Sequence, residues 1–356
     1  MSWNPLMPHD ALPLLPPRVV IETTPVLKKA IEARDSLARF DALASALPDP
    51  AVLINAIPLL EAQASSEIEN IVTTTDELFE ATAFQSGATP AAREALRYRS
   101  ALRIGFDELD GRPLTERTVA RLCSVIRGHE VSIRRGEVYI GDRGTGERIY
   151  TPPAGPRVIG RLLDNWAAFV NEPSGLDPLV RMAVAHYQFE AIHPFDDGNG
   201  RTGRIVNVLM LCSAGLLHLP LLYLSRYIIE SKDEYYRLLR AVTASGAWED
   251  WILYMLEGVR ATAARSIDLV GRVQAVRGEV IDAVRAALRA ADIGLVDVLM
   301  EQPYCRVRDV VERCGVTRQT ATRWLRDLVG AGVVSEIRAG REVLFVNGGL
   351  MDVLRA

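Results

Sequence analysis

The chain has 356 residues, which is long enough for two or three domains. Hydrophobic residues make up 49% and charged residues 24%, the balance of an ordinary globular protein. The net charge of −4 gives the whole chain no attraction to nucleic acid or anionic membranes. No apolar run approaches the roughly 18 residues that a membrane span needs, so a membrane partner is not expected.

The compartment follows from the cysteines and the N-terminus. The four cysteines form no Cys-x-x-Cys pair, which favours buried thiols in a reducing environment. The N-terminus is proline-rich and lacks a basic segment before an apolar stretch, so no signal peptide is predicted. We therefore expect a cytoplasmic protein.

Residues 1–110 are expected to form an N-terminal arm and a helical region. Residues 1–20 predict an extended arm that wraps the body, because proline blocks helix interiors. Apolar residues at helical spacing then predict one helix over 25–48 and a second over 50–69, with a kink at Pro58.

The second helix ends in the segment Ser65-Ser66-Glu67-Ile68-Glu69-Asn70. Asn70 is typical of the left-handed residue that follows a helix. Glu69 lies in the last turn, where its charge opposes the helix dipole. Either a cationic partner elsewhere balances Glu69, or it is a solvated carboxylate at the end of a helix.

Residues 111–271 are expected to form the main body. Two short β-branched and aromatic runs, 138–141 and 147–150, flank a glycine turn and predict a β-hairpin. The first run consists of Val138, Tyr139, Ile140 and Gly141. Helices are predicted around the hairpin at 91–109, 115–127, 157–171, 179–192, 231–243 and 247–271.

The densest chemistry lies in His193-Pro194-Phe195-Asp196-Asp197-Gly198-Asn199-Gly200-Arg201-Thr202-Gly203-Arg204. His193 is a base that can be neutral at pH 7. Asp197 is a hard oxygen ligand, suited to Mg²⁺ held together with substrate phosphates. The glycine turn and a helix starting near Gly200 predict an anion-binding concavity. Arg201 and Arg204 lie three apart and share a face, so the segment predicts phosphoryl or nucleotidyl transfer.

This segment resembles the core motif of Fic domains, HPFx(D/E)GNGRxxR, at every defining position. The likeness covers roughly residues 20–270 and implies a mainly α fold: a Fic-type helical bundle with a small β-hairpin flap. Most proteins of this family transfer AMP from ATP to a Ser, Thr or Tyr hydroxyl of a protein. The resemblance therefore implies a protein adenylyltransferase that uses ATP and Mg²⁺ and is able to modify itself.

The same resemblance assigns roles. His193 would be the general base, Asp197 the Mg²⁺ ligand, and Asn199 a partner of an α-phosphate oxygen. The phosphates would lie over Gly198, Gly200, Arg201 and Arg204. Residues 138–141 would be the flap edge that pairs with a target strand. Phe195 is expected to be a packing anchor.

Other candidates lie on the helices beside the motif. Ser231 is expected to cap a helix that carries Tyr235 and Tyr236, and these are either core tyrosines or groups that flank the adenine. His186 and Glu190 are four apart, but without a second histidine at zincin spacing His186 is expected to be a core residue.

A second motif gives Glu69 a partner. Ser65, Glu69 and Asn70 match the inhibitory motif (S/T)xxxE(G/N) of Fic proteins. The resemblance implies that Glu69 pairs with Arg204 in the place of the ATP γ-phosphate. The alternatives are another Fic-type transfer, removal of AMP with Glu69 positioning water, and a DNA-binding regulator with a nucleotide-sensing body.

Residues 272–356 are expected to form a separate domain. A helix over 273–290 leads to helix–turn–helix 307–329 and a hairpin over 333–346. This order resembles a winged helix-turn-helix, whose second helix can enter a DNA major groove. Its outward-facing residues would be Arg318, Gln319, Thr322, Arg323 and Arg326.

The charge of this region leaves its partner open. From residue 275 onward, twelve Arg stand against eleven Asp plus Glu, a net of +1. A DNA-binding face is usually more basic, and the same fold can contact proteins. DNA binding through residues 307–346, a protein partner and a homodimer all stay open.

Overall fold

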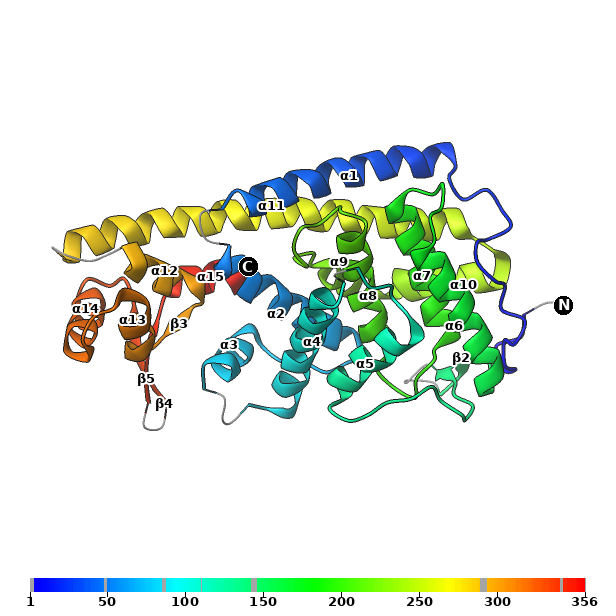
Figure 1. The fold of residues 1–356 in the computed structure, drawn as a ribbon, viewed down its shortest axis with the longest axis horizontal. Coiled ribbons are helices and arrows are strands. Elements are labelled where there is room, and N and C mark those ends of the chain that lie inside the picture. Colours follow the sequence, from blue (N-terminus) through cyan, green and yellow to red (C-terminus); the bar gives the residue numbers. More distant parts are fainter. Residues whose placement is uncertain are drawn as a thin grey trace.

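The computed structural model describes residues 3–47, 50–84, 88–109, 111–141, 146–288, 293–339 and 342–355. The fold is mainly helical with two small sheets, which confirms the predicted class (Figure 1). The predicted turn residues 48–49, 142–145 and 340–341 lie outside the described residues. Within the described residues, none of the helices has the length and hydrophobicity required to cross a bilayer.

Four helices form the N-terminal part, and two of them begin where a threonine side chain accepts a hydrogen bond from the first turn. Thr23 caps the first helix and Thr89 caps the fourth. The second helix runs through Pro58. The third was not predicted. They are α1 (Thr24–Ser45), α2 (Ala51–Ile68), α3 (Thr75–Phe84) and α4 (Pro90–Asp107).

The proline-rich arm packs along the body as expected. The Gln188 side chain donates to Pro13 O at 2.9 Å, and Leu15 N donates to Asn165 Oδ1 at 2.7 Å. These bonds connect the arm to two body helices, α6 (Pro156–Asn171) and α7 (Pro178–Ile192).

The body surrounds the central pair α7 and α8 (Asn199–Ser213), whose apolar side chains are buried on nearly all sides. The Asp177 side chain caps α7 by accepting a hydrogen bond from Leu179 N. The predicted hairpin is present but short: β1 (Ile140–Gly141) pairs antiparallel with β2 (Arg148–Tyr150). The remaining body helices are α5 (Glu116–Arg127), α9 (Leu224–Glu230) and α10 (Lys232–Ser245).

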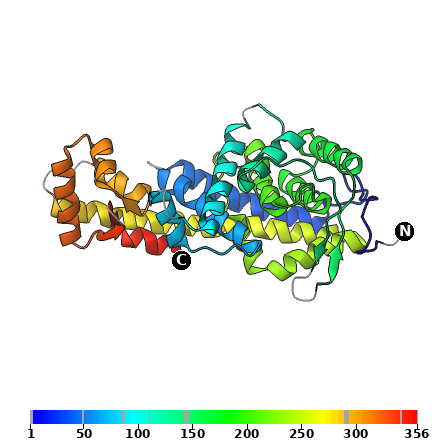
Figure 2. The same cartoon turned by 90° about the horizontal axis from the view of Figure 1, so that it is seen from below.

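One helix of 40 residues, α11 (Trp248–Ala287), replaces the two helices predicted on either side of Gly271. A Cβ at Gly271 would meet no atom within 4 Å, so this glycine lies in an exposed helix interior and costs only about 1 kcal/mol. Val270 and Val273 continue the buried face through it. Helix α1 packs along α11 (Figures 1 and 2).

The C-terminal unit lies at the far end of α11 from the N-terminal arm (Figure 2). It has the predicted order of two helices around Gly315 and a hairpin, plus two helices and a strand that were not predicted. Its sheet has the order β3-β5-β4 with antiparallel pairing. The elements are α12 (Ile293–Glu301), β3 (Tyr304–Cys305), α13 (Val307–Cys314), α14 (Arg318–Gly330), β4 (Ser335–Ala339), β5 (Glu342–Val346) and α15 (Gly348–Arg355).

Candidate active site

The loop between α7 and α8 is closed by its own side chains. Asn199 Oδ1 accepts from Phe195 N at 2.9 Å, and Asn199 Nδ2 donates to Phe195 O at 2.8 Å. Phe195 is fully buried, as expected of a packing anchor. Asn199 thus shapes the loop through one bond from each amide atom, and its contact with a phosphate oxygen stays a prediction. Gly198 enters α8 with a left-handed backbone, φ 87°.

His193 lies at the C-terminal end of α7 with a left-handed backbone, φ 49° and ψ 61°. Burial, together with the positive charge of Arg134, lowers the pKa of His193 to about 4. The imidazole is therefore neutral at pH 7. Among the described residues, His193 Nδ1 has no hydrogen-bond partner. A neutral imidazole is able to accept a proton.

Asp197 is half-exposed and paired with two arginines. Its carboxylate lies 2.5 Å from Arg127 Nη1 and 3.2 Å from Arg201 Nη2. Arg201 is buried and also pairs with Glu94. The described residues contain no cluster of three potential metal ligands. A single exposed carboxylate fits Mg²⁺ only when phosphate oxygens complete its shell, which is the usual mode for this ion.

Arg204 is buried and points to the end of α2. Its Nε donates to Ser65 Oγ at 2.8 Å, and its Nη2 donates to Ser65 O at 2.8 Å and to Glu69 Oε1 at 3.0 Å. A Cβ on Gly200 would collide with the Glu69 carboxylate, which therefore lies against the first turn of α8. The contact implied by the inhibitory motif is present, and Asn70 has the predicted left-handed backbone, φ 63°.

The two motif arginines thus diverge from one helix face toward different partners. Arg201 pairs with acids of α4 and of its own loop, whereas Arg204 pairs with α2. Burial alone would raise the pKa of Glu69, but the Arg204 charge lowers it overall. Glu69 is therefore ionised at pH 7 and compensates a buried guanidinium.

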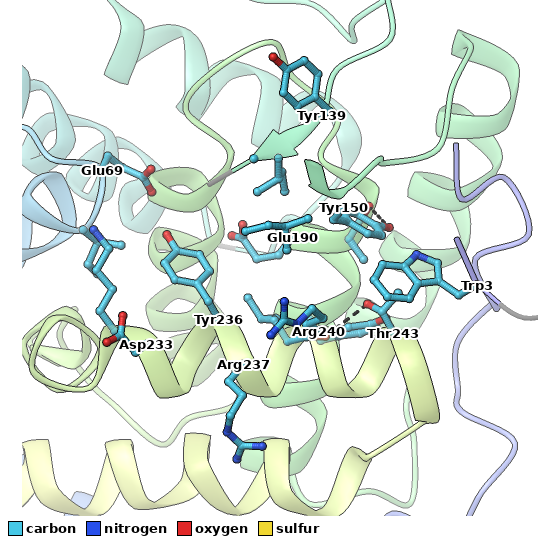
Figure 3. Close-up of a pocket in the computed structure, with 18 of the residues that line it drawn as sticks. Trp3, Glu69, Tyr139, Tyr150, Glu190, Asp233, Tyr236, Arg237, Arg240 and Thr243 are labelled. Atoms are coloured by element: carbon cyan, nitrogen blue, oxygen red, sulfur yellow. Dashed lines mark hydrogen bonds between the residues drawn. The ribbon is translucent and has the colours of Figure 1, made fainter. Parts of the chain in front are cut away.

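A cavity of about 690 Å³ opens beside Glu69. The end of α2, the β1–β2 hairpin, the end of α7 and the outer face of α10 surround it (Figure 3). Tyr236 rises from α10 toward this space, whereas Arg237 points away from it (Figure 3). The lining includes Trp3, Glu69, Asn70, Tyr139, Ile140, Gly141, Tyr187, Glu190, Lys232 and Tyr236.

Only one of the two predicted adenine-flanking tyrosines faces this cavity. The described lining includes Tyr236 but not Tyr235, which is buried and bonded to His186 Nε2 at 2.8 Å. His186 is a core residue, as expected, and burial lowers its pKa to about 3. Tyr235 therefore follows its alternative interpretation as a core tyrosine.

Ser231 and Val138 differ from their predicted roles. The Ser231 hydroxyl donates to Tyr227 O at 2.7 Å and pairs with Tyr254 OH at 2.8 Å. Ser231 is the N-cap residue of α10, as predicted, but its side chain makes no capping bond, and it is absent from the described cavity lining. Val138 precedes the paired part of the hairpin: of the run 138–141, all of it described, Ile140 and Gly141 alone have strand partners.

Sequence reasoning missed the acids and bases that complete the site from other helices. Glu94 and Arg127 belong to α4 and α5, where they looked like ordinary surface charges. Glu61 is buried in α2 and accepts from Tyr98 OH at 3.0 Å and Ser225 N at 2.9 Å, which fixes the helix that carries Glu69. The position of Glu61 within an apolar helical run was the sequence signal that could have indicated a buried carboxylate.

Glu190, considered from the sequence only for its spacing from His186, is another acid of the site. It lines the cavity, and within the described part of the chain its buried Oε1 has no hydrogen-bond partner. Burial raises its pKa to about 7, against the opposing charge of Arg204. A Cβ on Gly203 would lie 2.6 Å from Glu190 Oε1, so α7 and α8 approach each other closely here.

Comparisons with known proteins agree with this geometry. Residues 27–107 match the N-terminal domain of the Fic/DOC family, residues 113–211 match the Fic/DOC family domain, and residues 281–350 match the C-terminal domain of SoFic-like protein adenylyltransferases. The chain is 32% identical to protein adenylyltransferase fic-1 of Caenorhabditis briggsae over 162 residues, 45% of this chain and 28% of that protein. It is 33% identical to fic-1 of Caenorhabditis elegans over 137 residues, 38% and 24% of the two chains.

Each of these two alignments thus spans about a quarter of the relative's length. Among solved structures, a Fic family protein from Desulfovibrio desulfuricans G20 shares the fold over 94% of this chain and 98% of that one, with a TM-score of 0.59 at 20% identity. Residues 134–508 of Fic-1 from C. elegans give a TM-score of 0.55 at 21% identity, over 68% and 72% of the two chains. Three separate segments of this chain thus match domains of the Fic/DOC family or of SoFic-like proteins, and its fold resembles that of solved Fic proteins.

Proposed function

We propose that this protein is an adenylyltransferase that moves AMP from ATP to a hydroxyl group of a protein. The observation that carries the proposal is the Glu69–Arg204 contact at the N-terminus of α8, which marks a phosphate site. A neutral histidine lies at the start of the same loop. The curated relatives named above are protein adenylyltransferases, which supports the same reaction.

The ATP base would lie in the cavity near Tyr236. The described lining includes no residue of the motif loop or of α8, so the phosphates would extend past Glu69, which lies against Gly200, to the first turn of α8. His193 would take the proton of the target hydroxyl, and the oxygen would attack the α-phosphorus. The bond to the pyrophosphate oxygen breaks as the new P–O bond forms. Arg201 and Arg204 would stabilise the charge that develops on the phosphates. Asp197 would hold Mg²⁺, which supplies further charge neutralisation when bound with ATP.

The target would bind along the hairpin. Tyr139 is 56% exposed beside β1. An extended segment of the target could pair with the edge of this two-residue strand as an additional strand. A serine, threonine or tyrosine on that segment would then face His193. Main-chain pairing reads little side-chain identity, so the hairpin alone would select targets weakly.

Isotope position separates this reaction from other Fic-type transfers. Incubation with ATP labelled at the α-phosphorus should label protein, because AMP carries that atom. ATP labelled at the γ-phosphorus should leave the protein unlabelled. The chain should carry Glu69→Gly to release the site, with Glu69→Gly, His193→Ala as its control. Label from the γ position, or equal labelling of the double variant, would overturn the proposal.

Removal of AMP is a second candidate, because the Glu69 carboxylate lines the cavity and could position a water molecule. A protein labelled by the Glu69→Gly variant supplies the substrate. The wild-type chain should release AMP from it, and Glu69→Gly should not. Release at the same rate by both would exclude this use of Glu69.

Binding of DNA by the C-terminal unit is a separate candidate. Arg318, Arg323 and Arg326 are exposed on α14, the second helix of the helix–turn–helix pair. Affinity for a DNA duplex that falls steeply with salt, and falls further in Arg323→Ala, would support it. Unchanged affinity in that variant would favour a protein contact through this unit.

A further inference from the structure

Arg134 connects three consecutive residues at the catalytic histidine. Its side chain is almost fully buried, at 1% exposure. Arg134 Nε donates to His193 O at 2.7 Å, and Nη2 donates to Ile192 O at 3.2 Å. The backbone N–H of Arg134 donates to Pro194 O at 3.0 Å. The end of α7 and the start of the motif loop are thus held by one residue.

The same guanidinium also holds both sides of the hairpin. Arg134 Nη1 donates to Gly136 O at 3.0 Å, just before β1. Arg134 Nη2 donates to Pro153 O at 2.6 Å, just after β2. A planar guanidinium presents five N–H groups in fixed directions, so these four side-chain bonds fix the two segments relative to each other. The Tyr150 hydroxyl adds a parallel link to Ala191 O at 2.8 Å.

The backbone at His193, whose carbonyl accepts one of these bonds, has an unfavourable conformation. His193 is one of two non-glycine residues with a left-handed backbone in the described structure. Such a conformation persists only where the surroundings enforce it. The Arg134 bonds to the carbonyls of residues 192, 193 and 194 supply that enforcement.

We propose that Arg134 is a positioning residue that sets the backbone of His193 and the base of the hairpin in one geometry. The proposal rests on the proposed function, since it assumes that His193 is the base and that the hairpin receives the target. A target strand docked on the hairpin then presents its hydroxyl at a fixed place relative to the imidazole. A structural arginine without this role would leave the chemistry of His193 unchanged.

The charge of Arg134 affects the pKa of His193, which a simple loss of packing would not change in a predictable direction. The positive charge of Arg134 adds to burial in lowering the pKa of His193, while the charges of Glu69 and Asp197 act in the opposite direction. Removing the guanidinium should therefore raise the pH at which His193 loses its basic form. The acid limb of the pH–rate profile reports this change.

The test compares Arg134→Met with Arg135→Met, which changes the exposed neighbouring arginine. Both are made in the Glu69→Gly chain, and self-modification is followed at varied ATP and pH. Arg134→Met should lower the rate at saturating ATP about 100-fold, since a misplacement of about 1 Å can cost that much. Half-saturating ATP should change less than about threefold, because the phosphate site lies on α8. The acid limb should move to higher pH.

Arg134→Lys keeps the positive charge but loses the planar guanidinium that binds several carbonyls at once. It should retain the acid limb of the parent and still lose about tenfold or more in rate. This variant carries the test if thermal unfolding shows that Arg134→Met does not fold. A folded Arg134 variant within threefold of Arg135→Met would overturn the proposal, as would a slow Arg134→Met whose acid limb is unmoved.

Failure of the proposed function is distinguishable from failure of this inference. If the Glu69→Gly chain transfers no AMP, the function is wrong, whatever Arg134 does. The His193 ring can still be followed by NMR in ¹³C-histidine-labelled protein, with His193→Ala identifying its signal. A ring that starts to protonate at higher pH in Arg134→Met than in Arg135→Met supports the positioning role. An identical titration overturns it.

Discussion

Glu69 Oε1 accepts a hydrogen bond from Arg204 Nη2 at 3.0 Å, although the two residues stand 135 positions apart in the sequence. The hydrogen bond to the carboxylate comes from one guanidinium nitrogen, Nη2. The remaining bonds of the guanidinium go to the side chain and the carbonyl of Ser65. Residues at the C-terminal end of α2 therefore bind Arg204 through one neutral side chain, Ser65, and one charged side chain, Glu69.

The first prediction concerns release of Arg204. A hydrogen bond to a charged group contributes roughly 1.5–3 kcal/mol, so Glu69→Gly should raise self-modification about 10- to 100-fold. Intact-mass measurement after incubation with Mg·ATP counts the added AMP groups. Glu67→Gly, an exposed glutamate of the same helix end, is the matched control. A Glu69→Gly chain that gains no more AMP than this control would remove the inhibitory role.

A smaller release is expected from Ser65→Ala. This change removes the bond from Arg204 Nε to Ser65 Oγ and keeps the bond to the Ser65 carbonyl. One bond from a charged donor is lost while the Glu69 contact remains, so self-modification should rise about 3- to 10-fold. The same mass assay measures it. A rise equal to that of Glu69→Gly would mean that the serine, rather than the acid, dominates the restraint.

His193→Ala should abolish transfer without abolishing ATP binding. Loss of a general base commonly removes about 10²- to 10⁴-fold in rate, whereas the phosphate site on α8 stays intact. Because the pKa of His193 is lowered to about 4, the base is neutral above that pH and lost below it. Transfer limited by His193 should therefore stay level between pH 6 and 8. Two measurements on His193→Ala test this prediction: its rate of transfer, which should be lost, and its ATP affinity by calorimetry, which should match that of the wild-type chain.

Asp197→Ala should lose activity together with its Mg²⁺ dependence. The carboxylate is the hard ligand of the motif, and ATP binding must loosen its contacts with Arg127 and Arg201 before a metal can share it. Asp196→Ala, which changes the exposed neighbour, should keep both properties. Equal Mg·ATP affinities of the two variants by calorimetry would argue against Asp197 as the metal ligand.

Glu190 should make stability depend on pH. Its pKa is raised to about 7 from an ordinary 4.5, so the folded chain holds a proton that the unfolded chain releases. The free energy of unfolding should therefore fall as pH rises through this window, by about 2 kcal/mol between pH 5 and 7.5. Glu190→Gln should lack this decrease, measured as the difference in urea unfolding from the wild-type chain. Parallel pH profiles of the two chains would contradict the buried-acid assignment.

The sequence by itself determined the features that depend on near neighbours along the chain. Asn70 could be predicted as left-handed because a helix end needs such a residue. The start of α8 followed from a glycine turn before an apolar run. The amphipathic patterns located most of the helices, because helical periodicity is a property of residues three and four apart.

The predicted helix break at Gly271 shows where local signals mislead. A glycine weakens a helix locally, but the buried valines on both sides continue one apolar face into α11. Packing along α1 therefore decided that the helix continues. The same holds for Tyr235 and Tyr236, which are neighbours in sequence but lie on different sides of α10, so that only Tyr236 lines the described cavity.

Apart from the Glu69–Arg204 pair, which the motif resemblance implied, tertiary structure alone decided which charges meet at the site. Glu94, Arg127 and Arg134 carry no local signal that distinguishes them from solvated charges. They acquire partners because the folding of α4, α5 and the hairpin base around α8 brings them to the motif loop. Partners separated by many residues are selected by the burial of apolar faces across the whole body, which orients the helices. The motif therefore supplied the reactive groups, and the packed body supplied the charges that hold them in place.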